Sequence, residues 1–352
     1  MTSGQDAGST GRAVAITGAS GFVGQRLLAH LDRSPELGRL VGLDVRDPER
    51  RVRHLDFHRV DIAHAELKPM LDGIDVLVHL AAIHDPIPDV DLMARVNVGG
   101  TRRVLDAAAA VGVDRVVLMS SATVYGAWAN NPVPLTENEP LRPNSGFDPA
   151  VQSAEVERLL AEWCAAHPGV GVVVLRPAPI LGRGAQHLMA RVLAGAPVAV
   201  RGASSPVQCS HVDDVADALT RACTADMSGV YNVACDGWLD AADANELRVR
   251  RLRPSLPQEL AARALAAGWT SGLGDIPPGV VPLITHPWVV ANDRLRATGW
   301  EPSASNEDAL LATADSLATP PVWPWVVAGT ATVAAAVLAE EVLRRRRRRG
   351  RA

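Results

Sequence analysis

Short apolar runs alternate with amphipathic stretches through the first half of the chain. The apolar runs cover residues 13–17, 40–45, 75–80, 115–120 and 170–176. Helical patterns follow the first run and cover residues 90–111 and 154–166. Uninterrupted apolar strands are typical of parallel sheets that are covered on both faces. The pattern therefore predicts an α/β fold with a doubly wound, Rossmann-type parallel sheet and a smaller C-terminal lobe.

Composition excludes several classes of function. The last nine residues hold seven arginines, so the other 343 residues carry a net charge of −11 and lack the basic surface that nucleic acid requires. The four cysteines show no zinc-type spacing, so we expect no metal site. With no apolar leader in residues 1–12, the predicted location is the reducing cytoplasm. The only lysine is Lys68 and there are two tyrosines, which excludes a Tyr and a Lys one helical turn apart.

A glycine-rich turn joins the first apolar run to the first helical stretch. It reads GASGFVG, with Gly18, Gly21 and Gly24 at a GxxGxxG spacing. Gly18 permits a tight turn, Gly21 lets phosphates approach the backbone, and Gly24 lets the helix pack against the strand. Because N–H groups at a helix start attract anions, the sequence predicts that this turn binds the pyrophosphate of a dinucleotide.

The second apolar run ends near Asp44, which lies 26 positions after Gly18. A carboxylate there accepts hydrogen bonds from the adenosine ribose hydroxyls and repels a 2′-phosphate, which favours NAD over NADP. Arg46 is the counter-argument, because a nearby arginine can accommodate that phosphate. The other interpretation of Asp44 is an ordinary turn residue.

Together these motifs resemble the extended short-chain dehydrogenase/reductases, the NAD-dependent epimerase/dehydratase group. The resemblance covers about residues 13–302 and includes TGASGFVG, VDI, HLAA, NVGGT and SSATVYG. It implies a nucleotide sugar or a related alcohol or carbonyl as substrate, Ser121 as the catalytic hydroxyl, and a homodimer formed through two long helices. The cofactor-binding residues predicted by motif and resemblance are Gly18, Ser20, Gly21, Phe22, Val23, Gly24, Asp44, Asp61, Ile62, Leu80, Ala81, Ala82 and Asn97.

The family's YxxxK pattern is broken in this chain. In the family the Tyr phenol moves a proton, while the Lys lowers the phenol pKa and binds the ribose. Alignment of the helix near 150–166 places Pro149 at the Tyr position and Ser153 at the Lys position. Asp148, His84 and Asp85 are conceivable substitute bases, although each is better explained as a loop residue.

Two classes of function therefore remain open. The first is an enzyme of the epimerase/dehydratase type with a rearranged proton relay. The second is a catalytically impaired, NAD-binding regulatory or scaffold protein. The family resemblance favours the first, and the absent Tyr–Lys pair favours the second.

The change in pattern after about residue 182 predicts further parts of the chain. The expected parts are a flexible N-terminus (1–12), an NAD-binding domain (13–182), a substrate lobe (mainly 183–302, with 211–235 returning to the first domain), a linker (303–321), an apolar helix (322–343) and an Arg-rich tail (344–352).

The predicted C-terminal helix has several interpretations. It is close to one bilayer span in length, but a spanning helix would send the arginines outward, against the positive-inside tendency. A helix lying on the inner face of the membrane would place the arginines against anionic lipid. The remaining alternative is a weakly apolar helix that docks on the body or on another subunit.

Overall fold

The large domain is built around one parallel sheet. The computed structural model describes residues 11–34, 37–195, 199–200, 204–247 and 255–318. The sheet order is β10-β6-β5-β4-β1-β2-β3, which is the 3-2-1-4-5-6 order of doubly wound dinucleotide-binding sheets extended by one strand. Its strands are β1 (Arg12–Thr17), β2 (Leu37–Asp44), β3 (Leu55–Arg59), β4 (Val76–His79), β5 (Arg115–Met119), β6 (Gly171–Pro177) and β10 (Gly229–Val233). The predicted α/β fold is confirmed.

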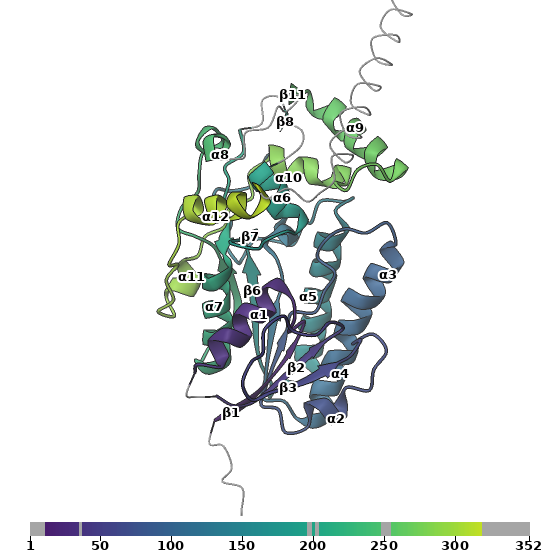
Figure 1. The fold of residues 1–352 in the computed structure, drawn as a ribbon, viewed down its shortest axis with the longest axis vertical. Coiled ribbons are helices and arrows are strands. Elements are labelled where there is room, and N and C mark those ends of the chain that lie inside the picture. The colour runs from purple at the N-terminus through teal and green to yellow at the C-terminus, as the bar shows by residue number, and fades with distance from the viewer. Residues whose placement is uncertain (1–10, 35–36, 196–198, 201–203, 248–254, 319–352) are drawn as a thin grey trace, which may run out of the picture.

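Helices cover both faces of this sheet (Figure 1). In β1, Val14 and Ile16 face one core and Ala13 and Ala15 face the other, because successive side chains of a strand point to opposite faces. The first core is covered by α1 (Phe22–Leu31) and α7 (Val212–Thr224), which pack against each other. The second face carries α2 (Lys68–Leu71), α3 (Val90–Ala94), a π-helical turn (Arg95–Gly100), α4 (Thr101–Val111) and α5 (Asp148–Ala166).

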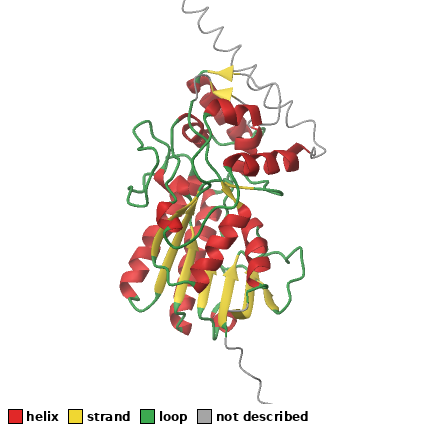
Figure 2. Ribbon diagram, turned by 90° about the vertical axis from the view of Figure 1, so that its left-hand side faces the viewer, coloured by secondary structure: helices red, strands yellow, loops and turns green. Residues whose placement is uncertain are grey.

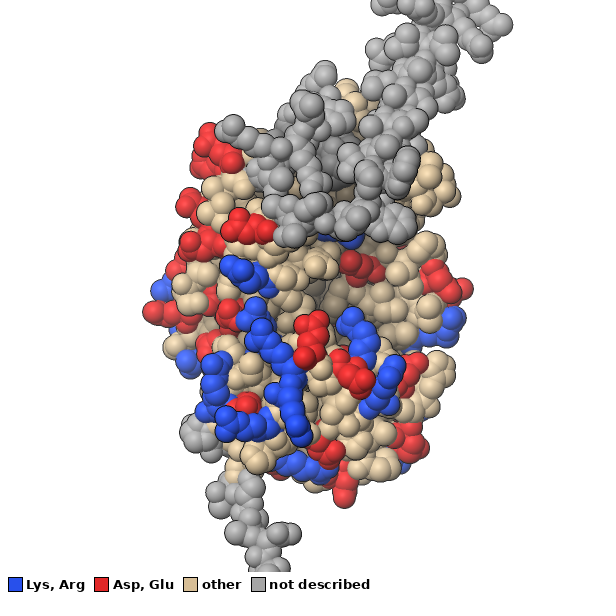
Figure 3. Space-filling view, viewed as in Figure 1, with Lys and Arg blue, Asp and Glu red and all other residues tan. Residues whose placement is uncertain are grey.

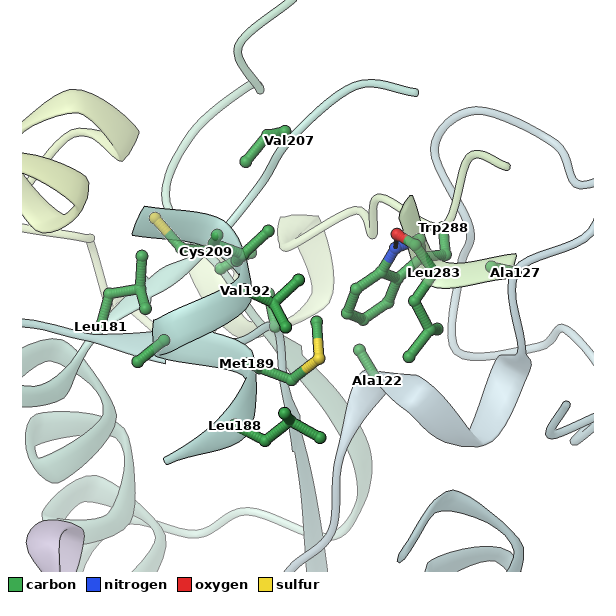
Figure 4. Close-up of a cluster of buried hydrophobic side chains, with 14 of the residues drawn as sticks. Ala122, Ala127, Leu181, Leu188, Met189, Val192, Val207, Cys209, Leu283 and Trp288 are labelled. Atoms are coloured by element: carbon green, nitrogen blue, oxygen red, sulfur yellow. Dashed lines mark hydrogen bonds between the residues drawn. The ribbon is translucent and has the colours of Figure 1, made fainter. Parts of the chain in front are cut away.

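A smaller lobe sits over the carboxyl ends of the strands (Figure 2). Its apolar core is separate from the two cores of the sheet, and Figure 4 shows Met189 and Val192 pointing toward Trp288. Its elements are β7 (Ile180–Leu181), α6 (Leu188–Gly195), β8 (Ala199–Val200), β9 (Ser210–His211), α8 (Ala241–Leu247), β11 (Ser255–Leu256), α9 (Gln258–Ser271), a 3-10 turn (Pro278–Val280), α10 (Val281–Thr285) and α12 (Asn306–Ala318). Helix α11 (Asp293–Arg296) instead packs against β10, with Leu295 in the first core of the sheet. A further 3-10 turn (Ala122–Tyr125) follows β5.

Strand β3 and the start of helix α5 differ from the sequence-based expectation. Strand β3 was not predicted, because it lies at the sheet edge and its mixed polar sequence, LDFHR, leaves no residue fully buried. Helix α5 begins at Asp148 rather than at residue 154. Pro149 lies in its first turn, where a missing N–H and a fixed φ cost nothing.

The predicted linker 303–321 is wrong over Asn306–Ala318, which form α12. Ala309, Leu310 and Thr313 of this helix are buried, and the helix packs against α6. The polar and proline-bearing composition hid a narrow apolar stripe at helical spacing, which is enough to dock a helix on an existing lobe.

The predicted apolar helix 322–343 and the Arg-rich tail 344–352 lie outside the described residues. Among the helices in the described ranges, none combines the length and the apolar character needed to cross a bilayer.

Adjacent leucines in α12 test whether this helix belongs to the folded lobe. Leu310 is 1% exposed and Leu311 is 44% exposed. We expect Leu310→Ala to lower the free energy of unfolding by about 2–5 kcal/mol, because it removes packed methyl groups and leaves a cavity. The matched control Leu311→Ala should change it by less than about 0.5 kcal/mol. Urea unfolding measures both free energies. Equally small changes in the two variants would show that this segment is a linker and not part of the folded lobe.

Candidate functional site

A cavity of about 560 Å³ opens at the carboxyl-terminal edge of the large sheet, beneath the small lobe. The loops that follow parallel strands all emerge at this edge, so the chain segments after β1, β2, β3, β4 and β5 share one wall. Most of the candidate cofactor residues, together with Ser121, Pro149 and Ser153, therefore meet in one cavity rather than at separate sites.

The glycine turn forms one end of the cavity wall. Gly18 has a φ of +72°, and a Cβ there would lie 2.7 Å from the backbone nitrogen of Ala81. A Cβ on Gly24 would clash with the carbonyl oxygen of Gly18. No side chain caps the start of α1, and residues 21–24 all line the cavity. The first-turn N–H groups, which lack acceptors within the helix, are therefore available to an anion in the cavity.

Asp44 lies at the end of β2, on the same wall and almost fully buried. Its Oδ2 accepts a hydrogen bond from the Ser20 backbone N–H at 2.9 Å, and its Oδ1 accepts one from the Arg46 N–H at 3.1 Å. Ser20 Oγ donates to the Arg46 carbonyl oxygen at 2.7 Å. Ser20 is thus not part of the cavity wall. It ties the glycine turn to the loop that follows β2 and holds the Asp44 carboxylate in place.

Asp61 and Ile62 follow β3 and continue the wall. The exposed Asp61 side chain accepts hydrogen bonds from the Ala63 N–H at 2.9 Å and from the His64 ring at 2.9 Å. These bonds lower the pKa of the Asp61 carboxyl, with the His64 bond as the larger cause. The carboxylate is therefore ionised at neutral pH.

Residues 80–82 follow β4 and line the middle of the cavity. Asn97 lies behind them rather than on the main wall. Its Oδ1 accepts a hydrogen bond from the Ile83 N–H at 2.7 Å, and its amide nitrogen donates to the Ile83 carbonyl oxygen and to Gln152 Oε1. Asn97 therefore fixes the loop after β4 against α5, which makes it a positioning residue for the wall.

Ser121 follows β5 and lines the far end of the cavity. Its Oγ accepts hydrogen bonds from the Thr123 N–H at 3.2 Å and from Thr123 Oγ1 at 2.9 Å. Both bonds use the lone pairs of the oxygen, so the hydroxyl proton can be donated to a ligand. Ser121 is arranged as a hydrogen-bond donor at this end.

Pro149 and Ser153, in the first turns of α5, line the cavity beside Ser121. Ser153 Oγ donates to the Pro149 carbonyl oxygen at 2.8 Å. Among the described residues that form the wall there is no tyrosine and no lysine. Tyr125 is buried, and its hydroxyl donates to Asn232 Oδ1 at 2.8 Å.

The small lobe and the loop before α5 supply wall residues that sequence reasoning missed. These are Phe147, His187, Leu188 and Met189. No motif or periodicity in residues 183–189 indicates that this segment returns to the strand ends. Only the fold brings it there.

A sequence profile of the NAD dependent epimerase/dehydratase family matches residues 14–234. The chain belongs to this family. The matched stretch contains the glycine turn, Asp44, Ser121 and Pro149, and it ends just after β10.

Several proteins are similar to this family member. An uncharacterized protein of Mycobacterium tuberculosis is 30% identical over 245 residues, which are 66% of this chain and 65% of that protein. The N-acetyl-alpha-D-glucosaminyl-diphospho-ditrans,octacis-undecaprenol 4-epimerase of Escherichia coli is 31% identical over 201 residues, 54% of this chain and 57% of that enzyme. The chain thus spans about two thirds, 65%, of the length of the first relative.

A solved structure with a similar fold is the UDP-glucose 4-epimerase of Thermus thermophilus in complex with NAD. It superposes with a TM-score of 0.66 at 22% identity, and the match covers 87% of this chain and 99% of that one. At this identity the similarity shows the fold.

A buried ion pair supports the Ser121 end of the site from behind. Arg176 Nε of β6 donates to Glu157 Oε1 of α5 at 3.0 Å, and Ser120 Oγ donates to the same oxygen. A further guanidinium nitrogen of Arg176 donates to Tyr125 Oη at 2.8 Å. Because these charges are buried and fully engaged, loss of one partner would leave the other uncompensated. The network therefore fixes α5 against β5 and β6.

His79, the last residue of β4, is buried beneath the middle of the wall. Its Nδ1 lies 2.6 Å from Thr17 Oγ1, and its Nε2 lies 2.8 Å from Thr101 Oγ1. Thr101 Oγ1 also donates to the Asn97 carbonyl oxygen, so it must accept from the Nε2–H of His79. Nε2 therefore carries a proton. Burial lowers the pKa of the ring to about 4, so the ring is neutral at neutral pH.

This buried histidine predicts a specific loss of stability in acid. In the unfolded chain the ring takes up a proton near pH 6.5, whereas in the folded protein it stays neutral down to about pH 4. Stability is therefore full above that upper value and falls as the pH drops between the two values, by at most about 1.4 kcal/mol per pH unit. Urea unfolding at several pH values gives the free energy of unfolding as a function of pH. Between the two pKa values this free energy should fall less steeply with decreasing pH for His79→Gln than for the wild type. The same pH dependence in both proteins would contradict a buried neutral ring.

Proposed function

We propose that this protein binds NAD in the cavity at the sheet edge and acts on an alcohol or carbonyl group of a nucleotide sugar or a related substrate. The position of Asp44 beside the glycine turn is the observation that carries the proposal. An uncapped helix start suits a pyrophosphate, and a buried carboxylate at the end of the neighbouring strand suits ribose hydroxyls. The residues present thus fit a dinucleotide.

NAD is favoured over NADP by the position of Asp44. Each carboxylate oxygen already accepts one backbone N–H and keeps lone pairs for hydroxyl donors. A 2′-phosphate placed there would bring a second anion next to a buried carboxylate, which is unfavourable. Arg46, exposed on the same wall, is the feature that would support NADP.

The residues at the other end of the cavity set what the protein could do to a substrate. A bound nicotinamide would accept or return a carbon-bound hydrogen with its electron pair. Ser121 would donate a hydrogen bond to the substrate oxygen and hold it in place. Pro149 and Ser153, which we align with the family's Tyr and Lys, offer no phenol and no ammonium group. The substrate's oxygen-bound proton must therefore pass to another group.

The substrate class rests on the relatives. Similar proteins include an epimerase of a polyprenyl diphosphosugar and an epimerase of UDP-glucose. On the face seen in Figure 3, basic and acidic side chains lie intermixed rather than in one basic patch, which agrees with a small-molecule substrate instead of nucleic acid.

A second candidate is a protein that binds NAD for regulation or assembly without turnover. The observation that favours it is the pair Pro149 and Ser153 on the cavity wall. A positioned acid or base contributes about 10²–10⁴-fold to a rate, and a site without any such group would be a binding site alone.

Calorimetric titration with NAD and with NADP tests the proposal. We expect the wild type to bind NAD more tightly than NADP. Asp44→Asn should weaken NAD binding by about tenfold or more, because hydrogen bonds to a charged acceptor are lost. The difference in affinity between NAD and NADP should also be smaller in Asp44→Asn than in the wild type.

Asp47→Asn is the matched control for this titration. Asp47 lies three positions away, is exposed, and pairs loosely with Arg59 at 3.8 Å without lining the cavity. It should leave both affinities unchanged. A wild type that prefers NADP would overturn the role of Asp44, and one that binds neither dinucleotide would overturn the proposal.

A further inference from the structure

The Ser121 end of the main cavity adjoins a small side pocket of about 30 Å³. His84, Ser120, Pro149 and Ser153 are among the residues that line this pocket. Its volume is that of one water molecule. Ser153 Oγ donates its hydrogen bond to the Pro149 carbonyl oxygen, so its lone pairs can accept a hydrogen bond from such a water.

Of the titratable side chains near this end, only His84 among the described residues lines both pockets. Asp148 lines neither. Asp85 lines the main cavity, but its Oδ1 accepts from the Leu188 N–H at 2.7 Å and its Oδ2 lies 4.0 Å from the Arg191 guanidinium. Asp85 is thus committed to holding the start of α6.

His187 also faces the main cavity, but both of its ring nitrogens are engaged. Its Nε2 donates to the Ile180 carbonyl oxygen at 2.7 Å, and its Nδ1 accepts from the Ala190 N–H at 3.3 Å. It is held as a neutral ring that packs near Phe22, with ring centroids 6.5 Å apart. His187 therefore shapes the wall and has no lone pair left for a proton.

The ionisation of His84 suits a proton acceptor. Burial lowers its pKa, and the neighbouring His187 lowers it further, while Asp85 and the Leu80 carbonyl oppose the shift. His84 nevertheless counts as an exposed residue, and it lines both pockets. At neutral pH the ring is therefore uncharged, and the residue borders both pockets.

We propose that His84 is the proton-transfer residue of this site and works through a water in the side pocket, in place of the family's Tyr–Lys pair. This inference rests on the proposed NAD-binding function. When a substrate alcohol is oxidised, its oxygen-bound proton passes through the water to the neutral imidazole. The carbon-bound hydrogen and its electron pair leave with the nicotinamide. The products are a carbonyl, a reduced cofactor and an imidazolium, and reduction returns the same proton.

Cofactor binding tests this geometry without a known substrate. A protonated His84 would repel the cationic nicotinamide of NAD⁺ but not the neutral ring of NADH. In the wild type, the ratio of the NAD⁺ to the NADH dissociation constant should rise by roughly tenfold as the pH falls through the His84 pKa, which lies below that of a free histidine. The ratio cancels effects on the adenine and phosphates, which both cofactors share.

His84→Gln should remove this pH dependence, because the amide does not titrate. His30→Gln is the matched control, since His30 lies in the last turn of α1 away from the cavity, and it should keep the wild-type dependence. A flat ratio in the wild type, or an unchanged dependence in His84→Gln, would overturn the role of His84. A wild type that binds neither cofactor would instead overturn the proposed function on which this role rests.

NMR titration of the histidine ring resonances gives a second readout. It is made on the wild type, and a variant is needed only to assign the His84 signal. NAD⁺ should lower the titration midpoint of the His84 ring, and NADH should leave it in place. Equal midpoints with both cofactors would contradict a ring that faces the nicotinamide.

Discussion

The close approach of the glycine turn to the end of β4 is the constraint on which the rest of the structure depends. Gly18 adopts a left-handed conformation and lies against Ala81, and Gly24 lies against the Gly18 carbonyl. Any side chain at either position would push α1 away from the sheet. This contact brings the first turn of α1 to the sheet edge, and the Ser20 to Asp44 hydrogen bond then fixes the carboxylate relative to it. The geometry of the cavity wall follows from these few contacts.

Much of the fold could be predicted because parallel strands buried on both faces leave continuous apolar runs. The runs at residues 13–17 and 115–120 became β1 and β5 almost unchanged. Strand β3 and helix α12 were missed for opposite reasons. The first is a polar edge strand that is stabilised by its neighbour β2, and the second is a polar segment whose narrow apolar stripe gains meaning only against α6.

Site residues that belong to a local motif could be predicted from their spacing along the chain. Residues that reach the site only through the tertiary fold could be predicted less well. The glycine turn, Asp44, Ser121 and residues 80–82 all line the cavity, whereas Ser20 and Asn97 lie behind its wall as positioning residues. His187, Leu188 and Met189 arrive from the small lobe and carry no local motif. The sequence does not show which of Asp148, Asp85 and His84 is the best candidate base. They differ in their hydrogen bonds and in the pockets they line, and both are set by the fold.

The fold accommodates Pro149 and Ser153 at the positions that we align with the family's Tyr and Lys. Pro149 suits the first turn of α5, and the Glu157–Arg176 ion pair still ties this helix to β5 and β6. In the proposed function, cofactor binding and proton transfer therefore rest on different residues of this chain. The most direct test of the central claim is native mass spectrometry of the full chain purified without added cofactor. The account predicts a bound mass equal to one NAD per chain. A chain that carries no dinucleotide, and takes up none when NAD is added in excess, would contradict it.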